Sequence, residues 1–328
     1  MFAALADADP RDLPVLVEAL APRAETLRET LWTMAQGPKR LRAAAMLARL
    51  EPESEPWKGI AKEVAADLVR ENPVYLGAWS ELLRPARRVL AEPLAAIFAD
   101  ANPDRASERS LATNLLTDWA ADDPATLTRL LMAADEKQFA RVWVPLQQRA
   151  AEAVPILTGV LSEKLAVAIP SSDPRREVLA LKQANAAVGL LKLGQTEKVW
   201  PLLRHAPDPR VRSYIIHRLF PMGADPEELI RRLDQEPDIS ARRALLLALG
   251  EFDEQRLPLA RRAALIPKIQ GMYQAEADAG FHAAAEWLLR QWRQEGYIQE
   301  VNGKWAKDTA RGEEALRRAG LPGAKPEW

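Results

Sequence analysis

The feature that most constrains the fold of this sequence is a basic residue that opens an apolar helical segment and recurs along the chain. The clear instances are Arg42, Arg109, Arg141, Lys182, Arg212 and Arg242, and weaker ones stand at Tyr75 and His282. From Arg42 onward the successive spacings are 33, 34, 32, 41, 30, 30 and 40 residues. Such a period is typical of repeats built from a pair of helices, each of which packs only on its neighbours.

The residues between these positions follow helical spacing. Leu245, Ala248, Leu249 and Phe252 stand at i, i+3, i+4 and i+7 and therefore share one helix face. Seven Asp-Pro or Asn-Pro pairs predict sharp helix starts, because Asp or Asn caps the first turn and proline suits it. Strand signals are poor, since β-branched residues are few. We therefore predict an all-α protein of about eight helix pairs.

A longer self-similarity indicates a weak internal duplication of residues 9–50 in residues 135–191. The second copy is expected to carry about 15 extra residues, centred on residues 169–173. The apolar positions that match between the copies are Leu13 with Phe139, Leu20 with Leu146 and Leu31 with Leu157.

Two regions are expected along the chain. Residues 1–295 form the repeat region, and residues 296–328 form a tail rich in glycine and charge. We predict that this tail is a loop, then a helix near residues 309–319, then a linker, because five glycines interrupt it.

Two short motifs resemble HEAT repeats. They are Asp208-Pro209-Arg210-Val211-Arg212 and Pro237-Asp238-Ile239-Ser240-Ala241-Arg242. The resemblance implies a HEAT-like α-solenoid over residues 1–295, wound as a right-handed superhelix. It also implies that the Asp caps the second helix of a pair, while the Arg reaches the acidic turn of the neighbouring repeat.

A second resemblance involves residues 199–252 and 281–292. They are similar to the HEAT-like middle region of large bacterial proteins, notably from planctomycetes. Those proteins also carry a serine/threonine kinase domain or a formylglycine-generating (sulfatase-modifying factor) module. The chain has no Gly-rich phosphate loop, His-Arg-Asp or Asp-Phe-Gly motif, and no cysteine. The resemblance therefore implies the scaffold of that family without its enzymes.

Composition excludes several classes of function. With no cysteine, the chain has no disulfide, thiol nucleophile or thiolate metal site. A net charge of -1 weighs against nucleic-acid binding. The longest run without a charged residue, Ala153 to Ser162, is too short to span a membrane, and the N-terminus does not resemble a signal peptide. We expect a cytoplasmic protein without a cofactor.

Few residues are candidates for chemistry. The three histidines lack partners at metal-ligand spacing, and we expect His217 to be half-buried or at an interface. Pairs of acidic residues fit helix capping better than acid–base catalysis. Most of the ten tryptophans are expected between helices. Trp305 and Trp328 lie beyond the repeats and are candidates for docking a following module.

The arginine series allows two interpretations. Arg42, Arg109, Arg141, Arg212 and Arg242 hold equivalent repeat positions and would form a ladder along one surface. That ladder is either a basic strip for acidic peptides or phosphates, or an internal set of ion pairs. We favour the internal ladder, with Asp208 and Asp238 as the partners, because Asp and Arg recur together.

These observations predict a non-catalytic scaffold that presents a concave helical-repeat surface to a protein, or a spacer between domains. One alternative is a fragment of a kinase or formylglycine-generating protein, because the chain begins within a repeat and ends in linker-like sequence. A second alternative is a nucleic-acid-binding HEAT-like protein. Uncapped repeat ends expose apolar surface, so we also expect end-to-end self-association.

Overall fold

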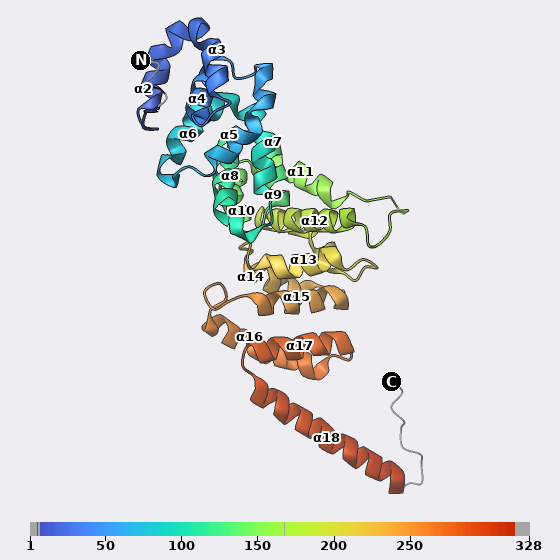
Figure 1. Ribbon diagram of the computed structural model, residues 1–328. Coiled ribbons are helices and arrows are strands. Elements are labelled where there is room, and N and C mark those ends of the chain that lie inside the picture. The colour runs from blue at the N-terminus through green and yellow to red at the C-terminus, as the bar shows by residue number, and fades with distance from the viewer. Residues whose placement is uncertain (1–4, 6, 167, 319–328) are drawn as a thin grey trace. The chain divides into compact units, whose positions relative to one another are not determined.

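A computed structural model describes residue 5 and residues 7–166 and 168–318, with side chains except those of residue 24 and residues 312–318. In this part of the chain the regular elements are all helices, so the all-α prediction is confirmed. Seventeen α-helices, α2 to α18, are joined by short loops and seven 3₁₀ turns (Figure 1). The chain divides into two compact units, Met1–Glu163 and Lys164–Trp328, which are described separately.

The first unit contains ten α-helices in its described residues. They are α2 (Leu13–Leu20), α3 (Ala24–Met34), α4 (Arg40–Leu50), α5 (Ala61–Leu68), α6 (Leu76–Leu83), α7 (Arg87–Phe98), α8 (Ala106–Trp119), α9 (Pro124–Ala133), α10 (Glu136–Gln147) and α11 (Ala150–Leu161). The 3₁₀ turns are η1 (Ala21–Arg23), η2 (Glu55–Gly59), η3 (Pro73–Tyr75), η4 (Arg84–Ala86) and η5 (Pro103–Arg105).

The helices of this unit alternate between two layers. In one layer, α4 contacts α6, α6 contacts α8 and α8 contacts α10, and we call these four helices layer A. In the other layer, α5 contacts α7 and α9 contacts α11. Large buried side chains such as Trp57, Trp79 and Phe139 fill the space between helices. The recurring basic positions of this unit, from Arg42 to Arg141, all lie on layer A helices or their 3₁₀ starts.

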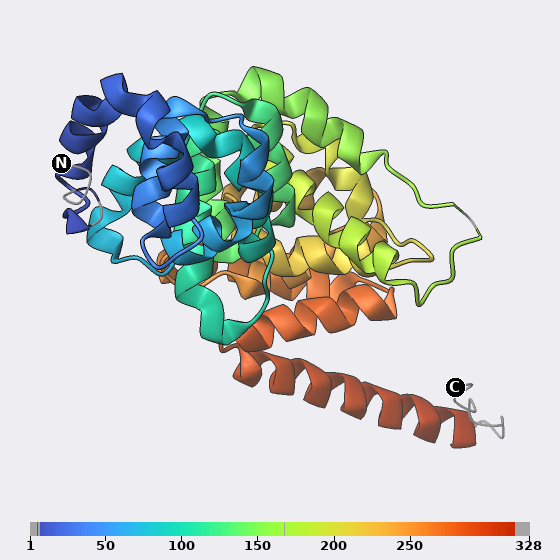
Figure 2. The same ribbon diagram turned by 45° about the horizontal axis from the view of Figure 1, so that its top comes forward.

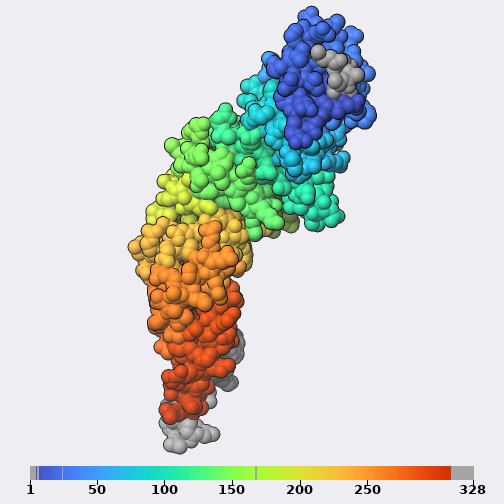
Figure 3. All heavy atoms as spheres, turned by 90° about the vertical axis from the view of Figure 1, so that its left-hand side faces the viewer, coloured from blue at the N-terminus to red at the C-terminus, as the bar shows by residue number. Residues whose placement is uncertain are grey.

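The second unit continues with seven α-helices in its described residues. They are α12 (Pro174–Lys192), α13 (Arg210–Leu219), α14 (Pro226–Gln235), α15 (Ile239–Glu251), α16 (Leu259–Ala275), α17 (Ala279–Gln291) and α18 (Glu295–Arg318), with 3₁₀ turns η6 (Thr196–Lys198) and η7 (Trp200–Leu203). One layer runs α12, α13, α15 and α17, while α14 packs on α15 and α16 packs on α17. Within this unit the helices follow one another in chain order along the surface (Figure 3).

The Asp-Pro and Asn-Pro pairs place helix starts as predicted at five of seven positions. Asp123, Asp173 and Asp225 cap α9, α12 and α14 through side-chain oxygens that accept backbone N–H bonds. Asn72 and Asn102 cap the 3₁₀ turns η3 and η5, from which α6 and α8 continue. The remaining two pairs, at residues 9–10 and 208–209, precede α2 and α13, and their carboxylates accept the N–H of the residue two positions on.

The two predicted copies contain the same succession of three helices, α2, α3 and α4 in the first and α10, α11 and α12 in the second. All six matched apolar positions named above are buried. The extra residues of the second copy lie in the connection from Leu161 to Pro174, where the first copy needs only the turn between Met34 and Arg40. Duplication itself stays a prediction.

The predicted tail is wrong in its first part. Residues 295–318 form one helix, α18, which projects away from α17 in both ribbon views (Figures 1 and 2). Buried Ile298 and Val301 anchor its first turns, so packing outweighs the cost of Gly296 and Gly303. The predicted linker from residue 319 onward lies outside the described residues.

Candidate functional site

Four arginines of the recurring series are held by contacts within the protein. Arg42 donates to the carbonyl oxygen of Ala8 from Nε and Nη2 at 3.2 and 3.0 Å, and Arg109 donates to that of Asp100 at 2.7 Å. In the second unit Arg212 bridges the backbone carbonyls of Leu203, at the end of η7, and Ser240, in the first turn of α15, at 2.9 and 3.1 Å. Arg242 contacts Glu276 Oε2 at 3.1 Å. These arginines tie successive helical segments together, which supports the internal interpretation.

The partners differ from those that we predicted. Asp208 pairs with Arg210 at 2.9 Å, and Asp238 caps α15 and accepts a hydrogen bond from the Ser240 hydroxyl. Neither forms an ion pair with Arg212 or Arg242 in the described part of the chain. The predicted Asp–Arg ladder is therefore wrong in its acidic members, because Arg212 donates to the backbone carbonyls of Leu203 and Ser240, and Arg242 donates to Glu276.

Arg141 is the exception in the series. It lies on α10, is exposed, and its guanidinium makes no hydrogen bond or ion pair with the described residues. It lines two neighbouring hollows of the first unit, together with Asn114 of α8. An arginine that serves no internal contact and faces two concave sites is the strongest binding candidate in the molecule.

The first hollow has a volume of about 320 Å³ and lies between α8 and α10. Most of its lining residues carry polar side chains, although about half of the exposed wall is apolar. The lining residues are Ala106, Ser107, Arg109, Ser110, Thr113, Asn114, Asp135, Lys137, Gln138 and Arg141. Lys137, like Arg141, is exposed and has no ion-pair partner among the described residues. The one carboxylate in the lining of this hollow is that of Asp135, which caps α10 and lies 3.5 Å from Arg109 Nε. The hollow therefore carries a surplus of positive charge.

The second hollow, of about 330 Å³, lies between α6 and α8 and is lined by Leu76, Gly77, Ser80, Glu81, Asn114, Leu115, Asp118 and Arg141. Its two carboxylates are already paired, because Arg84 contacts Glu81 at 3.0 Å and Asp118 at 2.7 Å. Asp118 also accepts a hydrogen bond from the Ser80 hydroxyl at 2.6 Å. The one guanidinium of Arg84 offsets one of the two negative charges of the hollow, and one negative charge remains.

The N-terminus of α10 is fixed by a capping box. Asp135 accepts the backbone N–H of Gln138, and the Gln138 side chain accepts the backbone N–H of Asp135, both at 2.9 Å. The buried Gln138 amide also donates to the carbonyl of Phe98, at 2.9 Å, and to Thr113 Oγ1, at 3.3 Å. This one side chain ties α10 to α7 and α8, so the two walls of the first hollow are held in register.

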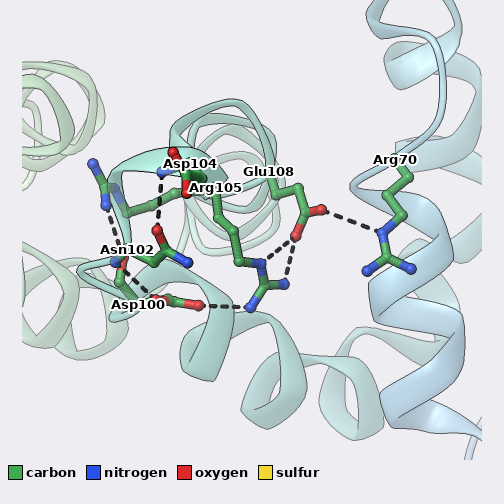
Figure 4. A network of polar contacts seen from close by, with 7 residues as sticks. Arg70, Asp100, Asn102, Asp104, Arg105 and Glu108 are labelled. Atoms are coloured by element: carbon green, nitrogen blue, oxygen red, sulfur yellow. Dashed lines mark hydrogen bonds and ion pairs between the residues drawn. The ribbon is translucent and has the colours of Figure 1, made fainter.

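A polar network fixes the start of α8 (Figure 4). Arg105 bridges Asp100 and Glu108, and Glu108 also contacts Arg70 of the preceding helix pair at 3.2 Å. The backbone N–H of Asn102 holds the pKa of Asp100 below its usual value, and Arg105 does the same for the pKa of Glu108. Both carboxylates are therefore charged at neutral pH, and the network places Arg109 one turn further along at the hollow.

The remaining candidates lie elsewhere. His217 is exposed rather than half-buried, with Nδ1 3.3 Å from Glu251 Oε1. Trp305, in α18, packs on the rings of Tyr273 and His282, each with centroids 5.5 Å away, and its role in docking a following module stays a prediction. Its side chain is still 38% exposed. Trp328 lies outside the described residues.

Two other kinds of functional feature, a metal-binding cluster and a membrane-spanning helix, are absent from the described residues. No cluster of three or more His, Asp or Glu side chains there has the arrangement needed to hold a metal ion. No helix in that part of the chain has the length and apolarity required to cross a membrane.

No known protein-family model matches the sequence. No curated protein matches it either.

Sequence reasoning found Arg109 and Arg141 but missed the rest of the first hollow. Ser107, Ser110 and Asn114 stand at i, i+3 and i+7 on α8, which is the spacing of one helix face. On α10, Lys137 and Arg141 stand at i and i+4. In the sequence, these positions form polar stripes at helical spacing. Unless it is known which helix faces such a stripe, it cannot be distinguished from an ordinary solvent-exposed helix face.

Proposed function

We propose that this protein is a non-catalytic, HEAT-like helical-repeat scaffold that binds an acidic segment of a partner protein across α6, α8 and α10. The observation that carries the proposal is Arg141. It holds the repeat position at which other arginines join neighbouring repeats, yet it has no partner among the described residues and faces two hollows. A position released from the internal role is available for a ligand.

Charge supports this proposal. The chain as a whole has a net charge of -1, so the unpaired cations at the first hollow are a local feature and not the consequence of a basic protein. A local basic site in a near-neutral chain favours a short acidic segment over the long polyanion of a nucleic acid, whose binding depends on many phosphate contacts. Hydrogen-bond donors from Ser107, Ser110 and Asn114 add directional contacts to the charge.

The resemblance to the middle region of bacterial multidomain proteins supports one extension. In that setting the acidic segment would belong to a kinase or formylglycine-generating module of the same polypeptide. A segment tethered in the same polypeptide binds intramolecularly. Its high effective concentration at the site means that binding does not require a high intrinsic affinity.

The test is a selection from a display library of random 12-residue peptides. We expect the wild-type chain to enrich peptides rich in Asp and Glu, and their affinity to fall about tenfold or more in Arg141→Glu. Arg87→Glu is the matched control, because Arg87 of α7 is also exposed, has no partner among the described residues and lines neither hollow. Enrichment of no peptide, or equal loss in both variants, would overturn the proposal.

A further inference from the structure

The donors of the first hollow converge from two helices. On α8, Ser107, Ser110 and Asn114 form one polar stripe, and on α10 Lys137 and Arg141 face it across the hollow. None of these five side chains makes a hydrogen bond or ion pair with the described residues. The guanidinium of Arg109 adds one more donor group, Nη2, to the hollow, because its Nη1 and Nε contact Asp100 and Asp135 respectively.

The charge of this hollow has a specific value. Three cations, Arg109, Lys137 and Arg141, line it against the single carboxylate of Asp135, which leaves a net charge of +2. A carboxylate side chain would neutralise half of that surplus. A phosphate monoester carries close to two negative charges at neutral pH and offers three strong acceptor oxygens. The charge and the number of donors therefore match a monoester dianion better than Asp or Glu.

We propose that the hollow between α8 and α10 binds a phosphorylated serine or threonine of the partner segment. The inference rests on the proposed function and specifies the group that the acidic segment presents. Arg141 supplies a paired contact to two phosphate oxygens, Lys137 supplies a point charge, and the serine hydroxyls and the Asn114 amide donate to the rest.

The second hollow accepts the residue beside the phosphorylated one. It shares Asn114 and Arg141 with the first, and its lining also contains Leu76, Gly77 and Leu115. Its two carboxylates share the single guanidinium of Arg84, so one negative charge of this lining is not offset by Arg84.

The experiment uses three fluorescent peptide libraries that differ at one position. Each peptide has seven residues, with serine, glutamate or phosphoserine fixed at the centre and mixtures of all amino acids except cysteine on either side. Binding to the full chain is measured by fluorescence polarisation at physiological salt. We expect the phosphoserine library to bind about tenfold or more tightly than the glutamate library. That advantage should disappear in Arg141→Ala and Lys137→Ala and persist in Arg87→Ala.

The outcomes separate the two proposals. Equal affinity for phosphoserine and glutamate would overturn this inference and leave the acidic-segment function standing. No binding of the phosphoserine library would also overturn the inference, and the display selection would then decide the function separately. Two further experiments test other sources of phosphate. One measures whether a 20-nucleotide DNA strand displaces the peptides, and the other whether the chain co-sediments with phosphatidylcholine vesicles that contain phosphatidic acid. Either result would overturn the inference, because the site would then not be selective for a phosphoprotein.

Discussion

The backbone of Gly250 in α15 lies directly against the indole ring of Trp287 in α17. A Cβ atom at Gly250 would stand 2.1 Å from Cζ3 of that ring, closer than any real contact. Glycine costs helix stability, so its presence near the end of α15 reflects this close approach. The pair sets how closely α15 and α17 pack in the second unit.

Gly250→Ala is therefore expected to destabilise the protein by about 1–3 kcal/mol, because the rigid ring must move and the gain in helix propensity is smaller. Gly271→Ala on α16 is the matched control, since a Cβ there meets nothing within 4 Å, and it should stabilise by about 0.5–1 kcal/mol. Urea denaturation measures both. If Gly250→Ala remains equally harmful when Trp287 is replaced by leucine, the ring is not the cause.

Truncation of Arg212 should lower the stability of the protein, whereas truncation of Arg141 should leave it almost unchanged, although the two residues hold equivalent positions in the sequence period. Arg212→Ala removes charged hydrogen bonds to the carbonyls of Leu203 and Ser240 and should cost about 1.5–3 kcal/mol in the free energy of unfolding. Arg141→Ala removes no internal contact and should change stability by less than about 0.5 kcal/mol. Urea denaturation midpoints of the two variants check this, and a large loss in Arg141→Ala would show that the residue is structural.

Gln138→Ala should loosen the junction of α7, α8 and α10. The buried amide donates to the carbonyl of Phe98, which would be left unsatisfied, so we expect a loss of about 2–3 kcal/mol. Gln147→Ala, at the exposed end of α10, is the control and should be nearly neutral. Thermal unfolding compares them, and similar midpoints would argue that water replaces the amide.

Lys192 predicts a pH dependence of stability. Burial, together with the positive charge of Arg256, lowers the pKa of Lys192 to about 8, whereas its pKa in the unfolded chain is near 10.5. Between these values the unfolded chain binds more protons, so stability rises with pH from about 8 to 10.5, and below pH 8 the full penalty of the buried charge is present. Because the amine is only about half-buried, solvent screening limits the rise to about 1–2 kcal/mol.

The measurement is the difference in unfolding free energy between the wild type and Lys192→Met across that range of pH. Subtracting the variant removes the contribution of the tyrosines, some of which titrate in the same window. We expect Lys192→Met to be more stable than the wild type near pH 7 and to lose this advantage by pH 10.5. A constant difference across the range would contradict the lowered pKa.

The sequence predicted the helical content well and the tail badly, for physical reasons that particular residues illustrate. Capping by Asp123, Asp173 and Asp225 is local chemistry, so a dipeptide is enough to place these helix starts. The helix at residues 295–318 depends on tertiary packing, shown by the burial of Ile298 and Val301 and the contact of α18 with α17, which glycine counts do not reveal.

The candidate site was predicted only in part for a related reason. Arg109 and Arg141 were found because they recur at a repeat period, but their different roles depend on loop geometry. The carbonyl of Asp100 reaches Arg109, whereas nothing in the described part of the chain reaches Arg141. A sequence period shows which positions are equivalent, and only the structure shows which of them is released from its internal contact.

Trp305→Ala should release the outer part of α18. Residues 302–311 are exposed, and an isolated helix of this length is marginal in water, so its order depends on the Trp305 ring packing on Tyr273 and His282. Without the indole we expect amide hydrogen exchange across residues 302–311 to accelerate about tenfold or more, while exchange in α17 changes little. Lys307→Ala, which removes an exposed side chain from the same helix, is the control and should leave exchange unchanged. Slow exchange in both variants would mean that the other contacts of α18, such as buried Ile298 and Val301 and the hydrogen bond from Tyr273 to Asn302, order the helix without the Trp305 ring.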